Sequence, residues 1–172
     1  AIGGAVTLAD IRIAQGRLCE AMRIYERGLQ MAVAQGAPGL RGTADIYVGM
    51  SEIHRERNDL YAATQCLLSS KELGEHTGFP QNRYRWRLAM ARIREAQGDM
   101  DGALDLLQEA ERFYVSAFSP NVRPVAALKA RIWIAQGKVG ETLGWVREQG
   151  LSAHDGLSYL REFEHITLAR VL

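Results

Sequence analysis

The chain has 172 residues, of which 47% are hydrophobic and 24% are charged, and its formal net charge is +1. This is the composition of an ordinary globular protein, long enough for one domain with a substantial core. The near-neutral charge gives no electrostatic argument for direct contact with nucleic acid. No apolar run approaches the ~20 residues that span a bilayer, and no signal segment precedes the first predicted helix. We therefore expect a cytoplasmic chain with neither a membrane nor nucleic acid as its partner.

A short turn sequence recurs along the chain. Its turn residue is Gly16, then Asn58, Gly98 and Gly137, at intervals of 42, 40 and 39 residues. A near-constant period of this length is typical of stacked supersecondary units. Apolar residues at helical spacing flank each turn, so every unit is predicted to be a hairpin of two helices.

In chain order, helices are expected over residues 2–14 and 18–35, then on both sides of the turns at 58–59 and 98. They are expected next over 125–136 and 139–149, and finally over 157–172. This pattern predicts an all-α fold without strands, a right-handed superhelix of about four and a half antiparallel hairpins. We expect a single domain whose units cover about 1–39, 40–79, 80–119 and 120–150, with a half unit at 155–172. The missing turn after the last helix and the missing initiating Met suggest a fragment of a larger protein.

Small residues recur at two positions of each unit. They stand seven residues before the turn residue and five residues after it, namely Ala9, Ser51, Ala91 and Ala130 and then Ala21, Ala63, Ala103 and Thr142. Two helices approach closely only where neither side chain protrudes, so these positions should mark the hairpin crossings. Isoleucine stands five residues before every turn residue, and these side chains, Ile11, Ile53, Ile93 and Ile132, are expected to fill the layers between units.

The turn sequence at residues 15–21, followed by Tyr25, resembles the tetratricopeptide repeat (TPR), which has a Gly turn, a small residue and an aromatic at this spacing. The present period is longer than the ~34 residues of that repeat. The aromatic expected four residues before the turn is mostly absent, because Arg12, His54 and Arg94 stand there and only Trp133 fits.

A narrower resemblance is carried by residues 130–137, Trp145, 150–152, 157–164 and 168–172. These segments resemble the helical-repeat domain of the large MalT-like, LuxR-type ATP-dependent transcriptional activators. In that family the helical domain lies between a nucleotide-binding module and a helix-turn-helix module, and it receives an inducer or a regulatory protein. The resemblance implies that ATP and DNA are bound by the parent protein and not by this chain.

Motifs for catalysis, metals or cofactors are weak. The segment 137–142 lacks the spacing of a phosphate loop, since Val139 follows Lys138 and no strand precedes it. Glu162 and His165 have a spacing that suits a metal, but a second such pair is absent from the sequence. We expect no enzyme, no cofactor and no metal. The segment 83–87 alternates arginines with aromatics, which suits nucleic acid, but packed aromatics and solvated arginines on a helix are the favoured interpretation.

The inner wall of the superhelix is the better functional candidate, because first helices line the concave face of such stacks. The position after the first small residue of each unit is expected to face inward, and it holds Asp10, Glu52, Arg92, Arg131 and Arg170. Four residues before these positions, on the same face, stand Val6, Val48, Leu88, Ala127 and Ile166. Three residues after them stand Ile13, Arg55, Glu95 and Ile134. Arginine forks suit carboxylate, phosphate or sugar hydroxyl groups. We expect a ligand or partner site around Arg92, Arg131 and Arg170, with Arg55 or Trp133 nearby and Asp10 and Glu52 at the acidic end. The alternative is that these charges pair with one another across units.

The sequence thus predicts an effector-sensing domain of a LuxR-type, MalT-like regulator that binds a small-molecule inducer or a regulatory protein. The alternative is a generic scaffold that holds a peptide or partner helix in its groove. The last helix has an apolar face without a polar cap, so we expect either that 157–172 caps the fourth unit by itself or that copies associate through this end.

Overall fold

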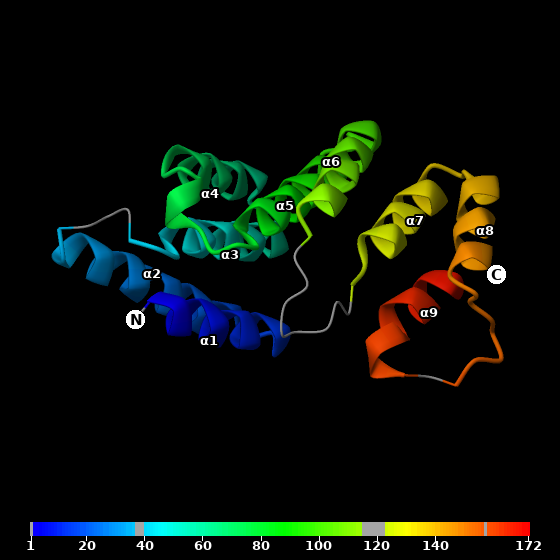
Figure 1. Cartoon of the computed structure of the whole chain (residues 1–172), viewed down its shortest axis with the longest axis horizontal. Coiled ribbons are helices and arrows are strands. Elements are labelled where there is room, and N and C mark those ends of the chain that lie inside the picture. The colour runs from blue at the N-terminus through cyan, green and yellow to red at the C-terminus, as the bar shows by residue number, and fades with distance from the viewer. Residues whose placement is uncertain (1, 37–39, 115–122, 157) are drawn as a thin grey trace.

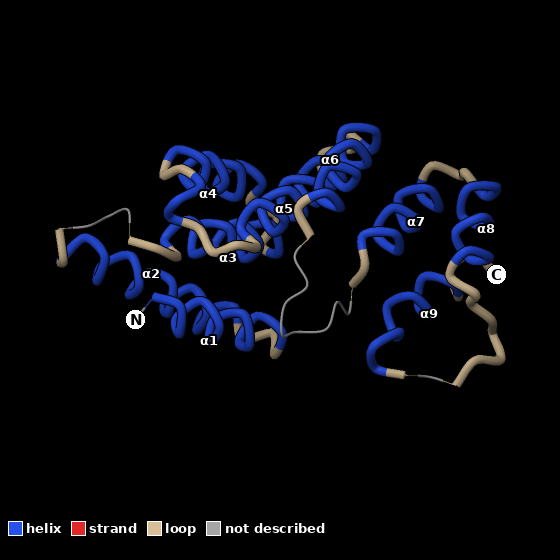
Figure 2. The backbone as a smooth tube through the Cα atoms, in the orientation of Figure 1, coloured by secondary structure: helices blue, strands red, loops and turns tan. Residues whose placement is uncertain are grey.

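A computed structural model describes residues 2–36, 40–114, 123–156 and 158–172. Every regular element in these ranges is a helix (Figure 2), which confirms the all-α prediction. The helices form antiparallel hairpins stacked into an α-solenoid (Figure 1). None of the helices in the described part of the chain is long and apolar enough to cross a membrane.

The hairpins follow the predicted turns closely. They pair α1 (Ile2–Ala14) with α2 (Leu18–Ala34), α3 (Thr43–Glu56) with α4 (Leu60–Glu72), α5 (Asn82–Ala96) with α6 (Met100–Arg112), and α7 (Val125–Ala135) with α8 (Val139–Glu148). A short 3₁₀ helix, η1 (Glu75–Thr77), leads into the third hairpin. Another, η2 (Tyr159–Arg161), leads into the last helix, α9 (Glu162–Leu168).

The four turn residues share one backbone geometry. Gly16, Gly98 and Gly137 have φ of 73°, 83° and 70°, and Asn58 has φ of 60°. Glycine is favoured there because a Cβ clashes in the left-handed region, and Asn is the side chain that tolerates it best. In each turn the following residue donates its backbone N–H to the carbonyl five positions earlier, as Asp99 does to Arg94 at 2.9 Å. This is the Schellman motif, which satisfies a carbonyl at the helix end and reverses the chain.

The recurring small residues are all buried. The eight positions from Ala9 to Thr142 are at most 2% exposed, as close helix packing requires. Ile53, Ile93 and Ile132 are also at most 2% exposed, and burying each side chain stabilises the fold by roughly 1.5–3 kcal/mol. The prediction for Ile11 is wrong, since it is 48% exposed. Its helix opens the stack, so no earlier hairpin in the described chain covers it.

The helices separate into two layers. The first helices pack in sequence, α1 against α3 and α3 against α5, and α9 returns to pack on α7. The second helices form the other layer and join neighbouring units, as α2 does with α3 and α6 with α7. The inner wall therefore consists of first helices, with α9 at its C-terminal end (Figure 1).

The C-terminal segment differs from the prediction of one long helix over 157–172. Only Glu162–Leu168 is α-helical, preceded by η2, and Leu157 lies outside the described residues. Leu168 is 5% exposed and Phe163 packs against the same core cluster as Trp145 and Leu151. This short helix therefore covers the fourth hairpin, which is the capping arrangement considered from the sequence.

Candidate functional site

A cleft of about 870 Å³ runs along the inner layer. Its wall is formed by α1, α3 and α5 on one side and by the segment 159–166 on the other. It is lined by Asp10, Ile13, Ala14, Gly16, Leu18, Val48, Gly49, Glu52, Arg55, Glu56, Arg85, Leu88, Arg92, Arg123, Tyr159, Glu162, Phe163 and Ile166. Residues of the first and the last helix thus line one cleft.

The predicted inner face supplies much of this wall. Asp10, Glu52, Arg55 and Arg92 line the cleft, together with four of the predicted apolar positions, Ile13, Val48, Leu88 and Ile166. The register counted from the turn residue was a sufficient signal for these positions, because each hairpin repeats the same geometry. Whether they bind a ligand stays a prediction.

Glu52 is the centre of an ion-pair network on this wall. It accepts hydrogen bonds from Arg92 at 2.8 Å and from Arg55 at 3.2 Å, and Arg55 also pairs with Glu56. Burial opposes ionisation of Glu52, but the charges of Arg92 and Arg55 outweigh it and hold the pKa of Glu52 below its usual value. The Glu52–Arg92 ion pair joins the second hairpin to the third. Charge pairing of this kind across units was the alternative to a ligand site that the sequence left open.

A second network lies at the N-terminal end of the cleft. Arg85 contacts Asp10 at 3.0 Å and Asp45 at 3.8 Å, and the buried Tyr25 hydroxyl donates to Asp10 at 2.8 Å. Asp45 also accepts the backbone N–H of Phe79 at 2.7 Å. Burial raises the pKa of Asp45 despite that hydrogen bond and the nearby guanidinium. The network ties the first hairpin to the third.

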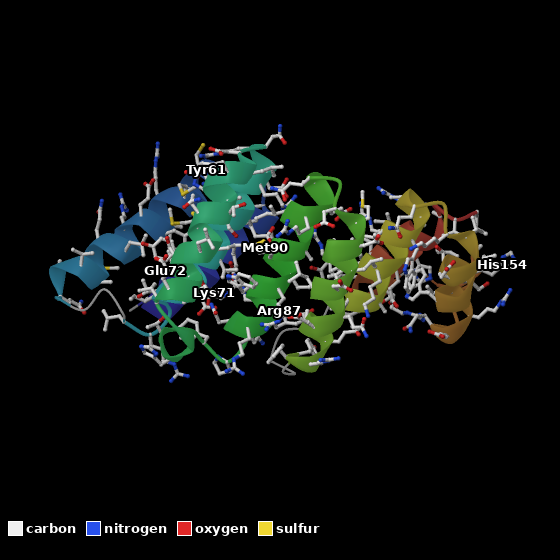
Figure 3. All side chains as sticks on the ribbon, turned by 90° about the horizontal axis from the view of Figure 1, so that it is seen from above. Tyr61, Lys71, Glu72, Arg87, Met90 and His154 are labelled. Carbon is white, nitrogen blue, oxygen red and sulfur yellow. The ribbon has the colours of Figure 1, made fainter. Side chains whose placement is uncertain are left out.

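Arg85 was not expected at this site. The alternating segment 83–87 suggested solvated arginines, but the Arg85 side chain is only 25% exposed. Of its neighbours, Tyr84 is buried, and the Trp86 indole donates to the carbonyl of Leu67 at 2.9 Å. Arg87, labelled in Figure 3, lies outside the cleft and pairs with Glu109 at 3.0 Å. A sequence signal for Arg85 is lacking, because its carboxylate partners are distant in the chain.

The C-terminal end of the cleft is built around Phe163. The guanidinium carbons of Arg131 and Arg123 lie 5.3 and 5.8 Å from the centre of its ring. Such distances are those of cation–π contacts. Burial and then the positive charge of Arg170 lower the pKa of Arg131. Of the predicted arginines, Arg131 contacts the Phe163 ring, but neither Arg131 nor Arg170 is among the residues that line the cleft. Arg123 and Phe163 do line it, and they were missed because they stand outside the repeated register.

Trp133 lies elsewhere. It packs against the core cluster of Ala130, Trp145, Leu151 and Leu168, and it does not line the cleft. Position 133 stands four residues before the turn, and the cluster that the side chain packs against joins α7, α8 and α9. The indole therefore contributes to the hydrophobic core of the C-terminal end.

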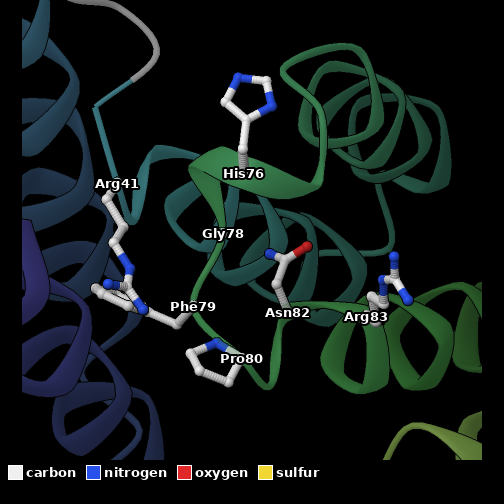
Figure 4. Close-up of a pocket in the computed structure, with 7 residues that line it drawn as sticks. All are labelled: Arg41, His76, Gly78, Phe79, Pro80, Asn82 and Arg83. Atoms are coloured by element: carbon white, nitrogen blue, oxygen red, sulfur yellow. The ribbon is translucent and has the colours of Figure 1, made fainter.

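A smaller hollow of about 470 Å³ lies at the junction of the second and third hairpins (Figure 4). It is lined by Arg41, His76, Gly78, Phe79, Pro80, Asn82 and Arg83. The Arg41 guanidinium lies 5.9 Å from the centre of the Phe79 ring. Most of this lining comes from connecting segments and none from the inner face, so the cleft is the stronger candidate site.

The other sequence motifs lie apart from one another. No group of three or more His, Cys, Asp or Glu residues suited to a metal occurs among the described residues. His165 contacts the carbonyl of Arg161 at 2.9 Å and Asp155 at 3.4 Å, while Glu162 is exposed at the cleft. The segment 137–142 comprises the turn after α7 and the first residues of α8. The cleft itself combines paired charges with apolar patches.

Solved structures with the same architecture are distant in sequence. BtubC (BKLC) from P. vanneervenii has a TM-score of 0.64 and 14% identity, with 91% of this chain and 68% of that chain covered. A structure of the nearly identical TPR-like repeats of a putative kinesin light chain from Podosopora anserina has a TM-score of 0.67 and 16% identity, with 99% and 84% covered. At these identities the likeness establishes the fold alone.

The sequence comparison is more specific. No curated protein matches the sequence of this chain. A family described as the MalT-like TPR region matches residues 1–172, the whole of the chain. With the two-layer stack of hairpins and the shape of its inner wall, this match confirms the sequence resemblance: the chain belongs to the MalT-like TPR region family.

Proposed function

We propose that this chain is the effector-sensing domain of a LuxR-type, MalT-like ATP-dependent transcriptional regulator, and that it binds a small molecule in the cleft. The family and the fold support a helical-repeat interaction domain. The observation that carries the finer proposal is the cleft itself. Its volume of about 870 Å³ lies within the ~300–1,000 Å³ of small-molecule sites.

The lining suits a small ligand with both polar and apolar parts. Arg92 and Glu52 present a paired charge that can reorient toward ligand hydroxyl groups, while Leu88, Ile166 and Phe163 present apolar surface. Small-molecule sites combine such apolar walls with a few convergent polar groups that fix orientation. Arg55, Arg85 and Asp10 on this wall are also held by ion pairs, which reduces the entropy lost on binding.

The position of the cleft provides a route from binding to activation. Its walls come from the first three hairpins and from the segment 159–166, which are distant in the chain. A ligand that contacts both walls binds most tightly when the superhelix is curled enough to bring them together. Binding then shifts the population toward that curvature, and the parent protein, with its ATP- and DNA-binding modules, responds to the shift.

The second candidate is a scaffold that holds a peptide or partner helix in the groove. A helix about 10–12 Å across with a pitch of 5.4 Å occupies roughly 400–600 Å³ per turn. The cleft of about 870 Å³ therefore has room for roughly one and a half to two turns, short of the three to four of a typical helix. The volume of the cleft favours a small effector.

The test is a thermal-shift panel of sugars, sugar phosphates, amino acids and carboxylic acids on two matched variants. Ile166→Trp fills the cleft, and Val33→Trp places the same side chain on α2, outside it; the native residues are 48% and 66% exposed. A compound at 100 times its Kd stabilises the folded chain by ~2.7 kcal/mol. We expect such a compound to raise the Tm of the unmodified chain and of Val33→Trp but not of Ile166→Trp. Equal shifts in both variants would place binding outside the cleft and contradict the proposal.

A further inference from the structure

Three arginines lie near one another beside the C-terminal end of the cleft, and Arg123 is the one of the three that lines it. Arg123 and Arg131 both approach the ring of Phe163, at 5.8 and 5.3 Å. Arg170 is close enough that its charge lowers the pKa of Arg131, an effect second only to burial. We call Arg123, Arg131 and Arg170 the arginine cluster. Arg123 and Phe163 line the cleft directly.

The arginine cluster lacks the carboxylate partners that the other cleft arginines have. Arg55, Arg85 and Arg92 each lie within 4.0 Å of a carboxylate, at 3.2, 3.0 and 2.8 Å. Across residues 2–36, 40–114, 123–156 and 158–172, no ion pair is formed by any member of the arginine cluster. The neighbouring segment 115–122 contains no acidic residue in the sequence.

Two carboxylates stand in this part of the molecule without neutralising the cluster. Glu95 raises the pKa of Arg131 through its charge, but burial and the neighbouring arginines outweigh it. Glu162 lines the cleft and is exposed. Like charges held together disfavour the charged form of each, and an added anion relieves that repulsion while it accepts charge-assisted hydrogen bonds.

We infer that the effector carries an anionic oxygen group, a carboxylate or a phosphate, that Arg123 and Arg131 bind beside Phe163 at the C-terminal end of the cleft. This inference rests on the proposed function and adds the chemical class of the ligand. The planar guanidinium fork matches both anions. Phe163, Leu88 and Ile166 lie along the same cleft and contact the apolar body of the molecule.

The volume of the cleft favours a small anion over an acidic peptide. About 870 Å³ holds a drug-sized molecule, and the arginines at the other end are already paired with Asp10 and Glu52, so that end has no unpaired arginine for further negative charge. One anionic group at the arginine end, with a neutral remainder, fits this distribution of charge. An acidic peptide is the competing ligand class that the experiment separates.

The experiment follows the arginine Nε–Hε resonances of the whole chain by NMR at constant ionic strength. The probes are phenyl phosphate, benzoate, inorganic phosphate, the neutral benzyl alcohol and hexaglutamate. The test variant is Arg123→Gln with Arg131→Gln, and its control is Arg23→Gln with Arg27→Gln. Arg23 and Arg27 are exposed on α2 and make no ion pair with the described residues, so both variants lose the same charge.

We expect phenyl phosphate, benzoate or both to bind the unmodified chain with saturation, and more tightly than inorganic phosphate and benzyl alcohol. The difference in affinity between phenyl phosphate and benzoate shows whether the site prefers a phosphate or a carboxylate. Affinity should fall at least tenfold in the test variant and change less than twofold in the control. Replacing the same two arginines with Lys keeps the charge but loses the fork, and affinity should then fall by an intermediate factor. If the Gln variant does not fold, the affinity of the Lys variant is compared with that of the control instead.

Three results would overturn the inference: equal loss in test and control variants, benzyl alcohol binding as tightly as the anions, or hexaglutamate binding more tightly than both small anions. Failure of the inference is distinguishable from failure of the proposed function. If neutral compounds bind and Ile166→Trp abolishes their binding, the cleft is an effector site of another chemistry. If Ile166→Trp changes no binding, the proposed function fails as well.

Discussion

Replacing Arg85 with Met tests whether the buried network at the N-terminal end of the cleft joins the first hairpin to the third. Met keeps an unbranched apolar stem and removes the guanidinium that contacts Asp10 at 3.0 Å and Asp45 at 3.8 Å. The Asp45 side chain is 1% exposed, so it loses its nearby cation without gaining water. Breaking a buried pair in this way costs about 3–5 kcal/mol.

The expected cost here is about 2–3 kcal/mol, below that range for two structural reasons. The Arg85 side chain is 25% exposed and Asp10 is 42% exposed, so part of the network is already solvated. Asp45 also keeps the backbone N–H of Phe79 at 2.7 Å. For a chain of this size the loss corresponds to a fall in Tm of roughly 4–12 °C.

The assay is urea denaturation at several pH values, with Arg27→Met as the control for removing an exposed arginine. Burial already raises the folded-state pKa of Asp45, and loss of Arg85 raises it further. Between the unfolded and folded pKa values the folded chain holds more protons, so stability of the variant rises as pH falls. The gap between the variant and the unmodified chain should therefore narrow from pH 7 toward pH 4.

Asp45→Asn added to the Arg85→Met background provides a second check. It removes the unpaired buried charge and keeps an oxygen that can accept from Phe79, so at least ~1 kcal/mol should return. If the stabilities of Arg85→Met and Arg27→Met agree within ~0.5 kcal/mol, the usual range for neutral surface substitutions, the Arg85 network does not stabilise the fold.

Three further predictions follow from the packing. Gly98→Ala should destabilise the chain by about 1–2 kcal/mol because its φ of 83° is unfavourable for a residue with a Cβ, although the space around it is open. Asn58→Gly keeps a residue that tolerates positive φ and should change stability by less than ~0.5 kcal/mol. The urea midpoints of the two variants would show this difference. Gly49→Ala should cost at least ~2 kcal/mol and expose Tyr25, since a Cβ would lie 2.1 Å from the Tyr25 hydroxyl oxygen; unchanged tyrosine fluorescence and Tm would contradict this. The folded pKa of Glu52 is lowered below 4.5, so its stabilisation is present above that pH and is lost as pH falls through the folded value; Glu52→Gln should flatten stability against pH below 4.5, and an unchanged slope would argue against the ion pair.

The repeating part of the molecule could be predicted from the sequence because its geometry is local. The turn residue sets the register of each hairpin, and the burial of Ala9, Ser51, Ala91 and their partners follows from that register. The same counting placed Glu52 and Arg92 on the cleft wall. Hydrophobic periodicity and Schellman turns repeat in every unit, so the wrong predictions for Ile11 and for the helix over 157–172 left the other units correctly predicted.

What could not be predicted depends on contacts between distant residues or on the chain ends. Arg85 and Asp10 are 75 positions apart and meet because the superhelix curls, which local patterns do not encode. Phe163 enters the cleft because the last helix begins at Glu162, five residues later than the pattern over 157–172 indicated. Ile11 is exposed because its helix has a neighbour on one side within the described chain.

The most direct test of the account is a crystal structure of the chain with a compound that raises its Tm in the panel. The account predicts electron density for that compound inside the cleft, between Leu88 on α5 and Phe163 on α9. Density on the opposite layer instead, for example beside Tyr61 on α4 (Figure 3), would contradict the assignment of the inner wall as the effector site.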